Sequence, residues 1–390
     1  MFKAEGHHFS LYLNAILESL NNKQQPYKVV LTPELKSSPA FDVIASKLRD
    51  NNVILIRNQL KGLNNLTKIY INLLNWYRLR RDLKDHLTAD SVSKIYIPTL
   101  DPMAKAFELL GSPFSNIPFY ALYMSPLRGS KINKKLQHKI KNAISELLFF
   151  RLVKLNSMKK LLLIDPLFFL DLIKSKPDLK NKIDYINDFS NPFEIISSSK
   201  AREKLNILTK NHIILVYGSL NKRKGIIELL NALNKSNIKN ICILLAGKPE
   251  KSIEKYIKSH PIVSKLKNSG QLFLKLKFLS SYEEKLVFSS ANSVWLGYTM
   301  GFDGSSGVLH QSVKAKLPVL SMRDGVIGFL TKKFKLGYTF NPVDINEVIS
   351  VLKKLEIDGN NSFINSETFE EFMNDHSSIK HTKKILRLIC

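Results

Sequence analysis

Hydrophobic and polar positions along the chain alternate between short apolar or β-branched runs and longer stretches of helical periodicity. This alternation is typical of parallel sheets covered by crossover helices, so the sequence predicts an α/β protein. In the first half we expect strands at 28–32, 52–57, 93–97, 118–124 and 161–165, and helices near 9–20, 66–87, 102–110 and 133–150. In the second half we expect strands at 212–217, 240–246, 272–278, 293–298 and 317–321, and helices near 225–234, 252–267, 282–289, 306–315 and 345–355.

The length of the chain predicts two domains, because 390 residues exceed the size at which a single hydrophobic core usually stops growing. A turn-rich stretch at 187–199 shows neither periodicity, and we expect the linker there. The expected domains are therefore 1–190 and 191–390, with the last helix free to pack back on the first domain.

The charge balance favours a polyanionic partner, because 59 Lys and Arg against 33 Asp and Glu leave a net charge of +26. A nucleic-acid partner would be indicated by aromatic residues interleaved with basic ones or by a recognisable reading helix. The sequence shows neither, so no nucleic-acid partner is expected. A basic nucleic-acid-binding protein stays an alternative. The two cysteines and the acidic residues lack metal-site spacing, which predicts no obligatory metal and no cofactor. No signal peptide or membrane span is evident, which predicts a cytoplasmic protein.

A basic loop follows the expected strand at 212–217 and leads into the next expected helix. Its small and polar residues include Gly218, Ser219, Arg223, Lys224 and Gly225. A glycine at the strand end lets the chain turn sharply, and cations beside a helix N-terminus suit phosphate, because free amides and the helix dipole already favour negative charge. We interpret the loop as a diphosphate site, with a solvated basic loop as the alternative.

A second loop joins the expected strand at 293–298 to the expected helix at 306–315. Its candidate residues are Asp303, Gly304, Ser305, Ser306 and Gly307, followed in the helix by Val308 and Gln311. The Asp303 carboxylate is suited to accept hydrogen bonds from sugar hydroxyls, and small residues let a ligand approach the backbone. The alternative is an Asp-Gly turn in which Ser305 or Ser306 caps the helix.

Taken together, in this order and at this separation, the two loops resemble the C-terminal domain of family 4-type glycosyltransferases (glycosyl transferases group 1) of GT-B fold. Those enzymes share a glycine after a strand, a Lys-Gly pair opening a helix, a later glycine after a strand, and a Glu-x7-Glu segment followed by Pro-Val. The matching positions here are Gly218, Lys224-Gly225, Gly247, Asp303 to Gln311, and Pro318-Val319. The resemblance covers residues 205–355.

This resemblance implies a GT-B fold: two Rossmann-like domains, their parallel sheets facing across an interdomain cleft, with the acceptor bound by 1–190 and the nucleotide sugar by 191–390. It implies a hexosyltransferase-like enzyme that moves a sugar, with retention of configuration, from a nucleotide-diphosphate sugar to a glycan or lipid-linked acceptor in cell-surface polysaccharide or glycoconjugate biosynthesis. By the same resemblance Lys224 holds the donor diphosphate, while Asp303 and Gln311 face the donor sugar and the ribose. Lys224 and Asp303 are the implied catalytic residues.

The chain departs from the family pattern at three places. Ser219 stands where many relatives have an arginine, which leaves Arg223 as the substitute. The two glutamates are replaced by a shorter acid and an amide, so a catalytically inactive glycosyltransferase-like scaffold is an alternative function. The histidine usual after the strand near Met124 is missing, and no residue there is assigned to acceptor activation.

Three residues of the first half are further candidates for contact with the acceptor or the donor sugar. Gly6 and His7 resemble the glycine-rich first loop of the family, and Asp101 lies in a loop after an expected strand. Surface or capping roles are the alternative for each. Only five residues precede Gly6, which leaves little room for a first strand, so either the start is truncated or the sheet lacks that strand.

The stretch 128–160 holds ten Lys or Arg and a single acid, with apolar residues at helical spacing. A basic amphipathic helix of this kind lies on anionic membranes, which predicts peripheral attachment at the inner face of the plasma membrane. The alternative is a helix packed on its own sheet with a solvated lysine face.

Overall fold

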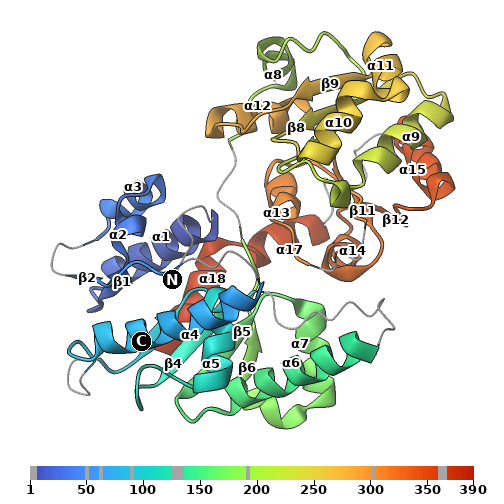
Figure 1. Cartoon of the computed structure of the whole chain (residues 1–390). Helices are drawn as coiled ribbons and strands as arrows, with labels where there is room; N and C mark the ends of the chain where they lie inside the picture. Colours follow the sequence, from blue (N-terminus) through green and yellow to red (C-terminus); the bar gives the residue numbers. More distant parts are fainter. Residues whose placement is uncertain are drawn as a thin grey trace. The chain divides into compact units, whose positions relative to one another are not determined.

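The computed structural model describes residues 7–48, 52–60, 65–87, 92–124, 136–189, 194–299, 302, 304–358 and 367–390. It divides into two compact units (Figure 1). Unit 1 comprises Met1–Asp188 together with Ser378–Cys390, and unit 2 comprises Phe189–Ser377.

Unit 1 alternates strands and helices along the chain and takes its last helix from the C-terminus. Its elements are α1 (His7–Asn22), β1 (Val29–Leu31), α2 (Pro33–Lys36), α3 (Pro39–Ala45), β2 (Val53–Leu55), α4 (Asn65–Leu83), β3 (Ile95–Ile97), the 3-10 helix η2 (Asp101–Met103), α5 (Ala104–Leu110), β4 (Phe119–Tyr123), α6 (Leu136–Lys154), β5 (Met158–Leu163), α7 (Pro166–Ser175), the 3-10 helix η3 (Pro177–Asn181), β6 (Ile183–Tyr185) and α18 (Ser378–Ile389).

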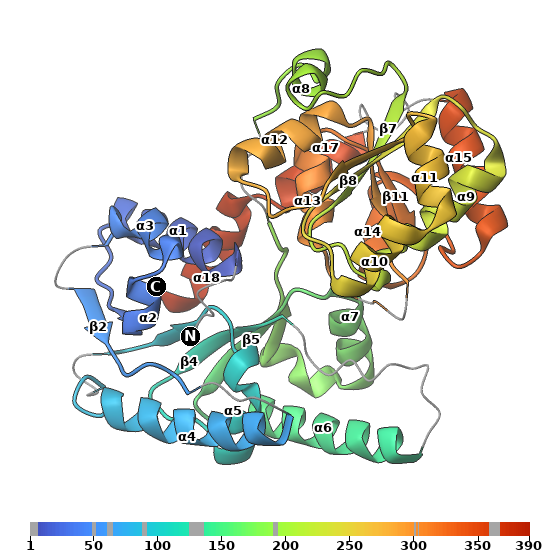
Figure 2. The same cartoon turned by 45° about the horizontal axis from the view of Figure 1, so that its top comes forward.

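These strands form two separate parallel sheets. One has four strands in the order β3-β4-β5-β6, and the other pairs β1 with β2. Because the larger sheet follows chain order, right-handed crossovers place the connecting helices on one face. Figure 2 shows α4, α5 and α6 along this face, and α5 contacts both of its neighbours. The core between them includes the fully buried rings of Phe107, Phe119 and Phe149.

The C-terminal helix α18 packs against α1, the first helix of the chain. The rings of Tyr12 and His381 stack with their centroids 4.8 Å apart. The Tyr12 hydroxyl donates a hydrogen bond to Asp188, and His381 Nδ1 donates to the Asn187 carbonyl oxygen at 2.6 Å. Helices α1 and α18, from the two ends of the chain, therefore both bind residues 187 and 188, where the chain leaves unit 1 for unit 2.

Unit 2 repeats the alternation with longer buried strands. Its elements are α8 (Ser198–Lys204), β7 (His212–Tyr217), the 3-10 helix η4 (Lys222–Lys224), α9 (Ile226–Ser236), β8 (Ile241–Ala246), α10 (Lys251–Ser259), α11 (Pro261–Asn268), β9 (Leu272–Lys275), α12 (Ser281–Ser290), β10 (Ser293–Leu296), α13 (Gly307–Lys314), β11 (Val319–Met322), α14 (Gly325–Lys333), β12 (Gly337–Phe340), α15 (Ile345–Asp358) and α17 (Glu367–Asp375).

The sheet of unit 2 is six-stranded and parallel, in the order β12-β11-β10-β7-β8-β9. The chain starts in the middle at β7, proceeds outward to β9, then returns to the other side of β7 with β10 and proceeds outward to β12. The apolar residues of α9, α10, α11 and α15 form one core with the sheet. Every residue of β8 is buried, as expected of a parallel strand covered on both faces.

The helix expected at 252–267 is two helices, which corrects that expectation. Pro261 lacks the amide that a continuous helix requires, and its ring would clash with the carbonyl group of the preceding turn. The chain instead ends α10 at Ser259 and starts α11 at Pro261, with the His260 ring accepting a hydrogen bond from the Ile262 amide at 3.3 Å.

Candidate functional site

The candidate site lies at the carboxyl ends of β7 and β10, which are neighbours in the sheet of unit 2. The strand order reverses between these two strands, because β8 and β9 lie beyond β7 and β11 and β12 lie beyond β10. Open parallel sheets bind ligands at such a reversal, beyond the carboxyl ends of the strands. Both loops singled out from the sequence start here, the β7 loop at 218–225 and the β10 loop at 297–306.

The β7 loop approaches the β10 loop so closely that a side chain at Gly225 would not fit. Gly225 has φ +64°, and a Cβ atom added to it would stand 2.1 Å from the Gly297 carbonyl oxygen. Gly218, with φ +99°, makes the turn directly after β7. The meeting of the loops therefore requires glycine at Gly225, and the positive φ favours glycine at Gly218.

Hydrogen bonds fasten the two loops together. The Thr299 amide donates to the Arg223 carbonyl oxygen at 2.7 Å, and the Thr299 hydroxyl donates to that of Lys222 at 3.3 Å. The Trp295 indole donates to the Lys224 carbonyl oxygen at 2.9 Å. The backbone of the basic segment is thus fixed by β10 and by the residues after it.

Lys224 is a buried cation, with 7% of its surface exposed. Its Nζ donates to the Tyr217 carbonyl oxygen at 2.6 Å and to the Tyr298 hydroxyl at 3.3 Å. Within the part of the chain that the structure describes, no carboxylate pairs with it. A buried ammonium held by neutral groups favours the arrival of an anion, and the described residues take up two of the three donor positions of Nζ.

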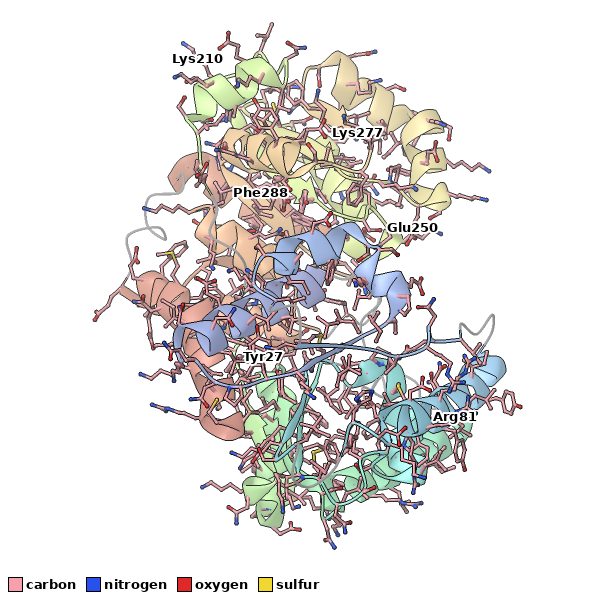
Figure 3. The ribbon with its side chains drawn as sticks, turned by 90° about the vertical axis from the view of Figure 1, so that its left-hand side faces the viewer. Tyr27, Arg81, Lys210, Glu250, Lys277 and Phe288 are labelled. Carbon is pink, nitrogen blue, oxygen red and sulfur yellow. The ribbon has the colours of Figure 1, made fainter. Side chains whose placement is uncertain are left out.

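Most other cations of the chain are on the surface, as Arg81, Lys210 and Lys277 illustrate in Figure 3. Arg223 is also exposed, yet its guanidinium is held in place by aromatic rings. Its Cζ lies 4.5 Å from the ring centroid of Phe302, which itself stacks on Tyr298 with centroids 4.4 Å apart. The ring attracts the positive charge of the guanidinium and restricts its position, and the fork of N–H donors on a guanidinium suits phosphate oxygens.

Helix α13 begins directly after the β10 loop, at Gly307. Ser306 precedes it, and its hydroxyl is hydrogen-bonded to the Tyr298 hydroxyl at 3.0 Å instead of capping the helix. Gly304, Ser305 and Val308 belong to the same turn and first helical residues. The α13 N-terminus therefore adds backbone amides and a positive dipole end to this edge of the sheet. Asp303 and Gly301 lie outside the described residues.

Gln311 contacts a carboxylate that the sequence pattern does not indicate. Its amide donates to Glu284 of α12, and the Tyr217 hydroxyl donates to the same carboxylate. Burial raises the pKa of Glu284, and burial together with Glu284 raises the pKa of Tyr217. Ser219, the residue next along the β7 loop from Gly218, is exposed. The candidate site thus combines a cationic loop with a hydrogen-bonded carboxylate.

The candidates of the first half belong to unit 1. Gly6 and the side chain of His7 lie outside what the structure describes, although α1 starts at His7. Asp101 starts η2, and its Oδ2 accepts a hydrogen bond from the Met124 amide at 2.9 Å and from the Thr99 hydroxyl at 3.5 Å. These bonds show that Asp101 stabilises the turn between β3 and α5.

The described residues contain no group of three or more His, Cys, Asp or Glu arranged to hold a metal ion. No helix among them is both long enough and apolar enough to cross a membrane.

No protein-family model matches the chain, and no curated protein sequence matches it. Solved structures do match. HepE from Anabaena, in complex with UDP, has a TM-score of 0.68 at 13% identity, covering 98% of this chain and 96% of that one. A glycosyltransferase from Rickettsia africae has a TM-score of 0.66 at 13% identity, covering 98% and 93%. WaaG, a glycosyltransferase involved in lipopolysaccharide biosynthesis, has a TM-score of 0.62 at 13% identity, covering 98% and 96%. The chain therefore has the GT-B fold, with two Rossmann-like α/β units built on parallel sheets.

Proposed function

We propose that the protein is a glycosyltransferase that takes its sugar from a nucleotide-diphosphate donor bound at the carboxyl ends of β7 and β10. The observation that carries the proposal is Lys224, a buried cation with no carboxylate partner among the described residues, located where the strand order reverses. HepE, which shares the fold, forms complexes with UDP and with UDP-glucose. A UDP-sugar is therefore the first donor to test.

The donor diphosphate lies, in this proposal, over the β7 loop and the N-terminus of α13. Lys224 neutralises charge as the bond from the sugar to the diphosphate breaks, and Arg223 binds a second phosphate oxygen. The leaving group already departs readily, so positioning and charge neutralisation are the enzyme's main contributions. The family resemblance adds Asp303 at the sugar and retention of configuration.

We place the ribose of the donor beside Gln311 and Glu284. The Glu284 carboxylate accepts hydrogen bonds, and the Gln311 amide and the Tyr217 hydroxyl orient it. A vicinal pair of hydroxyls is a matching donor for such a carboxylate. This arrangement gives the site an acid on the ribose side although Gln311 itself is an amide.

Membrane attachment is the second part of the proposal, and it rests on helix α6. Phe149, Leu152 and Val153 of this helix are buried in the core of unit 1, whereas Ile144 and Leu147 are 55% and 66% exposed. The basic residues Arg151 and Lys154 continue the exposed side along the next turns. Exposed apolar side chains beside cations suit the surface of an anionic bilayer, where a glycan or lipid-linked acceptor is assembled.

Isothermal titration calorimetry with UDP-, GDP- and other nucleotide sugars tests the donor site. We expect one of them to bind and Lys224→Ala to weaken it about 10- to 150-fold, the value of a charged hydrogen bond of about 1.5–3 kcal/mol. Lys235→Ala is the matched control, because it removes an exposed cation from the last turn of α9. Equal affinities for both variants would refute the proposal, and binding without any turnover would favour the scaffold.

Flotation with anionic liposomes at two salt concentrations tests the membrane contact. We expect binding that weakens as salt rises, because screening reduces the attraction of surface cations. Leu147→Gln should lower the bound fraction at both concentrations. Unchanged flotation of Leu147→Gln would show that α6 serves only to pack on its own sheet.

A further inference from the structure

Tyr298 connects the β7 loop to the β10 loop, although the sequence pattern does not single it out. It is the second residue after β10, and 5% of its surface is exposed. Its side chain contacts Lys224 and Arg223 of the β7 loop and Phe302 and Ser306 of the β10 loop. One buried side chain therefore contacts both of the cations that the proposed function assigns to the donor diphosphate.

The hydroxyl of Tyr298 bridges Lys224 and Ser306. Lys224 Nζ donates to its oxygen at 3.3 Å, and Ser306 Oγ lies 3.0 Å from the same oxygen. An ammonium group only donates, so the Tyr298 oxygen is the acceptor in the first of these bonds. The single hydrogen of the hydroxyl is then directed to Ser306 Oγ, which accepts it. The two bonds therefore run in one direction, from the cation through Tyr298 to the residue that precedes α13.

The position of the Lys224 ammonium depends on this bridge. Besides Tyr298, its partner among the described residues is the Tyr217 carbonyl oxygen, at 2.6 Å from Nζ. A Cβ atom added at Gly218 would lie 3.6 Å from Nζ, so the ammonium lies beside the turn that directly follows β7. A long lysine side chain held by one acceptor keeps much of its rotational freedom, whereas two acceptors from different loops restrict it. The Tyr298 hydroxyl therefore helps to hold Nζ at the carboxyl end of β7.

The ring of Tyr298 acts on the second cation, Arg223. It stacks on the ring of Phe302, with the centroids 4.4 Å apart and an angle of 27° between the planes. Arg223 Cζ lies 4.5 Å from the Phe302 centroid and 5.8 Å from the Tyr298 centroid. Both rings attract the positive charge, and stacking on a buried ring restricts the partly exposed Phe302. The Tyr298 ring therefore positions Arg223 through Phe302.

We propose that Tyr298 is a positioning residue of the donor site, whose hydroxyl holds Lys224 for the β-phosphate and whose ring holds Arg223 through Phe302. This rests on the proposed function, because both cations must bind the donor diphosphate. Tyr298 itself touches no substrate and acts through the two cations. Its contribution to nucleotide affinity therefore disappears when the cation that it positions is removed.

Tyr298→Phe removes the hydroxyl and keeps the ring. Calorimetry measures the affinity of this variant for UDP and UMP, or for GDP and GMP if the donor titration identifies a guanine nucleotide. We expect the affinity for the diphosphate to fall about 3- to 10-fold, the value of one hydrogen bond. The monophosphate lacks the β-phosphate that Lys224 binds in this proposal, so its affinity should stay nearly unchanged. Equal losses for the diphosphate and the monophosphate would overturn the proposal and assign Tyr298 to the fold alone.

Double-mutant cycles identify which cation each part of the side chain positions. Tyr298→Phe should have no further effect on diphosphate affinity in a Lys224→Ala background, and its full effect in an Arg223→Ala background. Phe302→Leu should weaken diphosphate binding about 2- to 5-fold, with the opposite pattern in the two backgrounds. Because Phe302 is partly exposed, Phe302→Leu supplies the test if Tyr298→Phe does not fold. Effects that simply add in every background would overturn the proposal.

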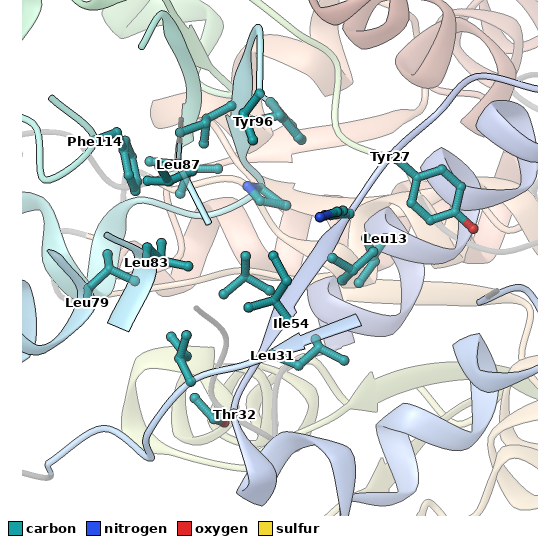
Figure 4. A pocket seen from close by; sticks show the side chains of 18 of the residues that line it. Leu13, Tyr27, Leu31, Thr32, Ile54, Leu79, Leu83, Leu87, Tyr96 and Phe114 are labelled. Atoms are coloured by element: carbon teal, nitrogen blue, oxygen red, sulfur yellow. The ribbon is translucent and has the colours of Figure 1, made fainter. Parts of the chain in front are cut away.

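Tyr27→Phe is the matched control for the loss of a hydroxyl. The Tyr27 hydroxyl also has two hydrogen-bond partners, the Asn21 side-chain oxygen and the Lys47 carbonyl oxygen, each at 3.0 Å. Tyr27 belongs to unit 1, where it lines the cavity shown in Figure 4, whereas the candidate donor site belongs to unit 2. We expect Tyr27→Phe to lower the melting temperature and to leave both nucleotide affinities unchanged. The same loss of diphosphate affinity in Tyr27→Phe as in Tyr298→Phe would contradict a specific role of Tyr298.

The donor site and the positioning role fail in different ways in these titrations. If no nucleotide binds, or if Lys224→Ala binds the diphosphate as tightly as the unmodified protein, the donor site is wrong and the role of Tyr298 is wrong with it. If Lys224→Ala weakens binding while Tyr298→Phe leaves the ratio of diphosphate to monophosphate affinity unchanged, the positioning role alone is wrong. A ratio that falls in Tyr298→Phe, and does not fall further when Lys224→Ala already lacks the ammonium, is the result that we expect.

Discussion

Gly225→Ala is the substitution that most directly tests the meeting of the β7 and β10 loops. The added Cβ would lie 2.1 Å from the Gly297 carbonyl oxygen and 3.4 Å from the Thr299 Cγ2 atom. Real Cβ contacts start near 3.0 Å, so the loops must separate by about 1 Å. That shift stretches the 2.7 Å bond from the Thr299 amide to the Arg223 carbonyl oxygen.

The expected loss of stability has two parts. A non-glycine residue at φ +64° costs about 1–2 kcal/mol, and the stretched hydrogen bond with its neighbours costs about 1–2 kcal/mol more. The free energy of unfolding of unit 2 should therefore fall by about 2–4 kcal/mol. For a domain of this size the melting temperature falls by roughly 4–16 °C.

Gly270→Ala separates the two parts. Gly270 has nearly the same φ, +70°, but an added Cβ would meet nothing within 4 Å. Tryptophan fluorescence in urea, in a Trp76→Phe background, follows unit 2 through Trp295, the second of the two tryptophans. We expect Gly225→Ala to lose more stability than Gly270→Ala and to lose nucleotide affinity as well. Equal losses of stability would refute the close approach of the loops.

Variants at three further residues test groups that pack around the sheets. Burial, assisted by the nearby Arg202, lowers the pKa of His212 from 6.5 to about 4. Above pH 6.5, neutral His212 therefore contributes roughly 3 kcal/mol to the free energy of unfolding of unit 2, and this contribution is lost as pH falls toward 4. Measured by urea unfolding, the stability of His212→Gln should depend less on pH over that range. Burial raises the pKa of Glu284 above 4.5. The contribution of Glu284 to the free energy of unfolding is therefore complete below pH 4.5 and is lost as pH rises through the raised pKa. In the same assay, Glu284→Gln should not show this loss of stability. Asp165 accepts hydrogen bonds from two amides at the start of α7, so Asp165→Ala should cost unit 1 about 1 kcal/mol in thermal unfolding while Asp165→Asn costs less.

The alternation of apolar runs with helical stretches was sufficient to predict the α/β class and the central strands of unit 2. Residues 240–246 illustrate the reason, because a strand covered on both faces is apolar at almost every position. The short strand β6 (Ile183–Tyr185) at the edge of its sheet was not predicted, since three residues carry no periodicity. Helix α7 was missed as well, although Asp165 and Pro166 are a recognisable start signal for a helix.

Strand neighbours could not be predicted in this way, because the sequence orders elements along the chain and says nothing of which strands pair. That β10 lies beside β7 follows from where the chain crosses back over the sheet. For α18 the sequence left the last helix free to pack on the first domain, and the structure adds that its partner there is α1. Helix periodicity identifies an apolar face, and it does not identify the surface that covers it.

The same reasoning explains why Gln311 was predicted as a candidate while Glu284 was not. Motif spacing identifies residues on one loop and the helix that follows it, and Gln311 lies on α13 within that reach. Glu284 is 27 residues earlier, on α12, and approaches Gln311 only because the two helices flank β10 in sequence and β10 lies next to β7. An amide at position 311 therefore does not leave its surroundings without an acid, because the sheet order brings the Glu284 carboxylate of another helix next to it. Whether a replaced motif residue abolishes a site must accordingly be judged from the side chains around it, and here those side chains include Tyr217 and a half-buried carboxylate.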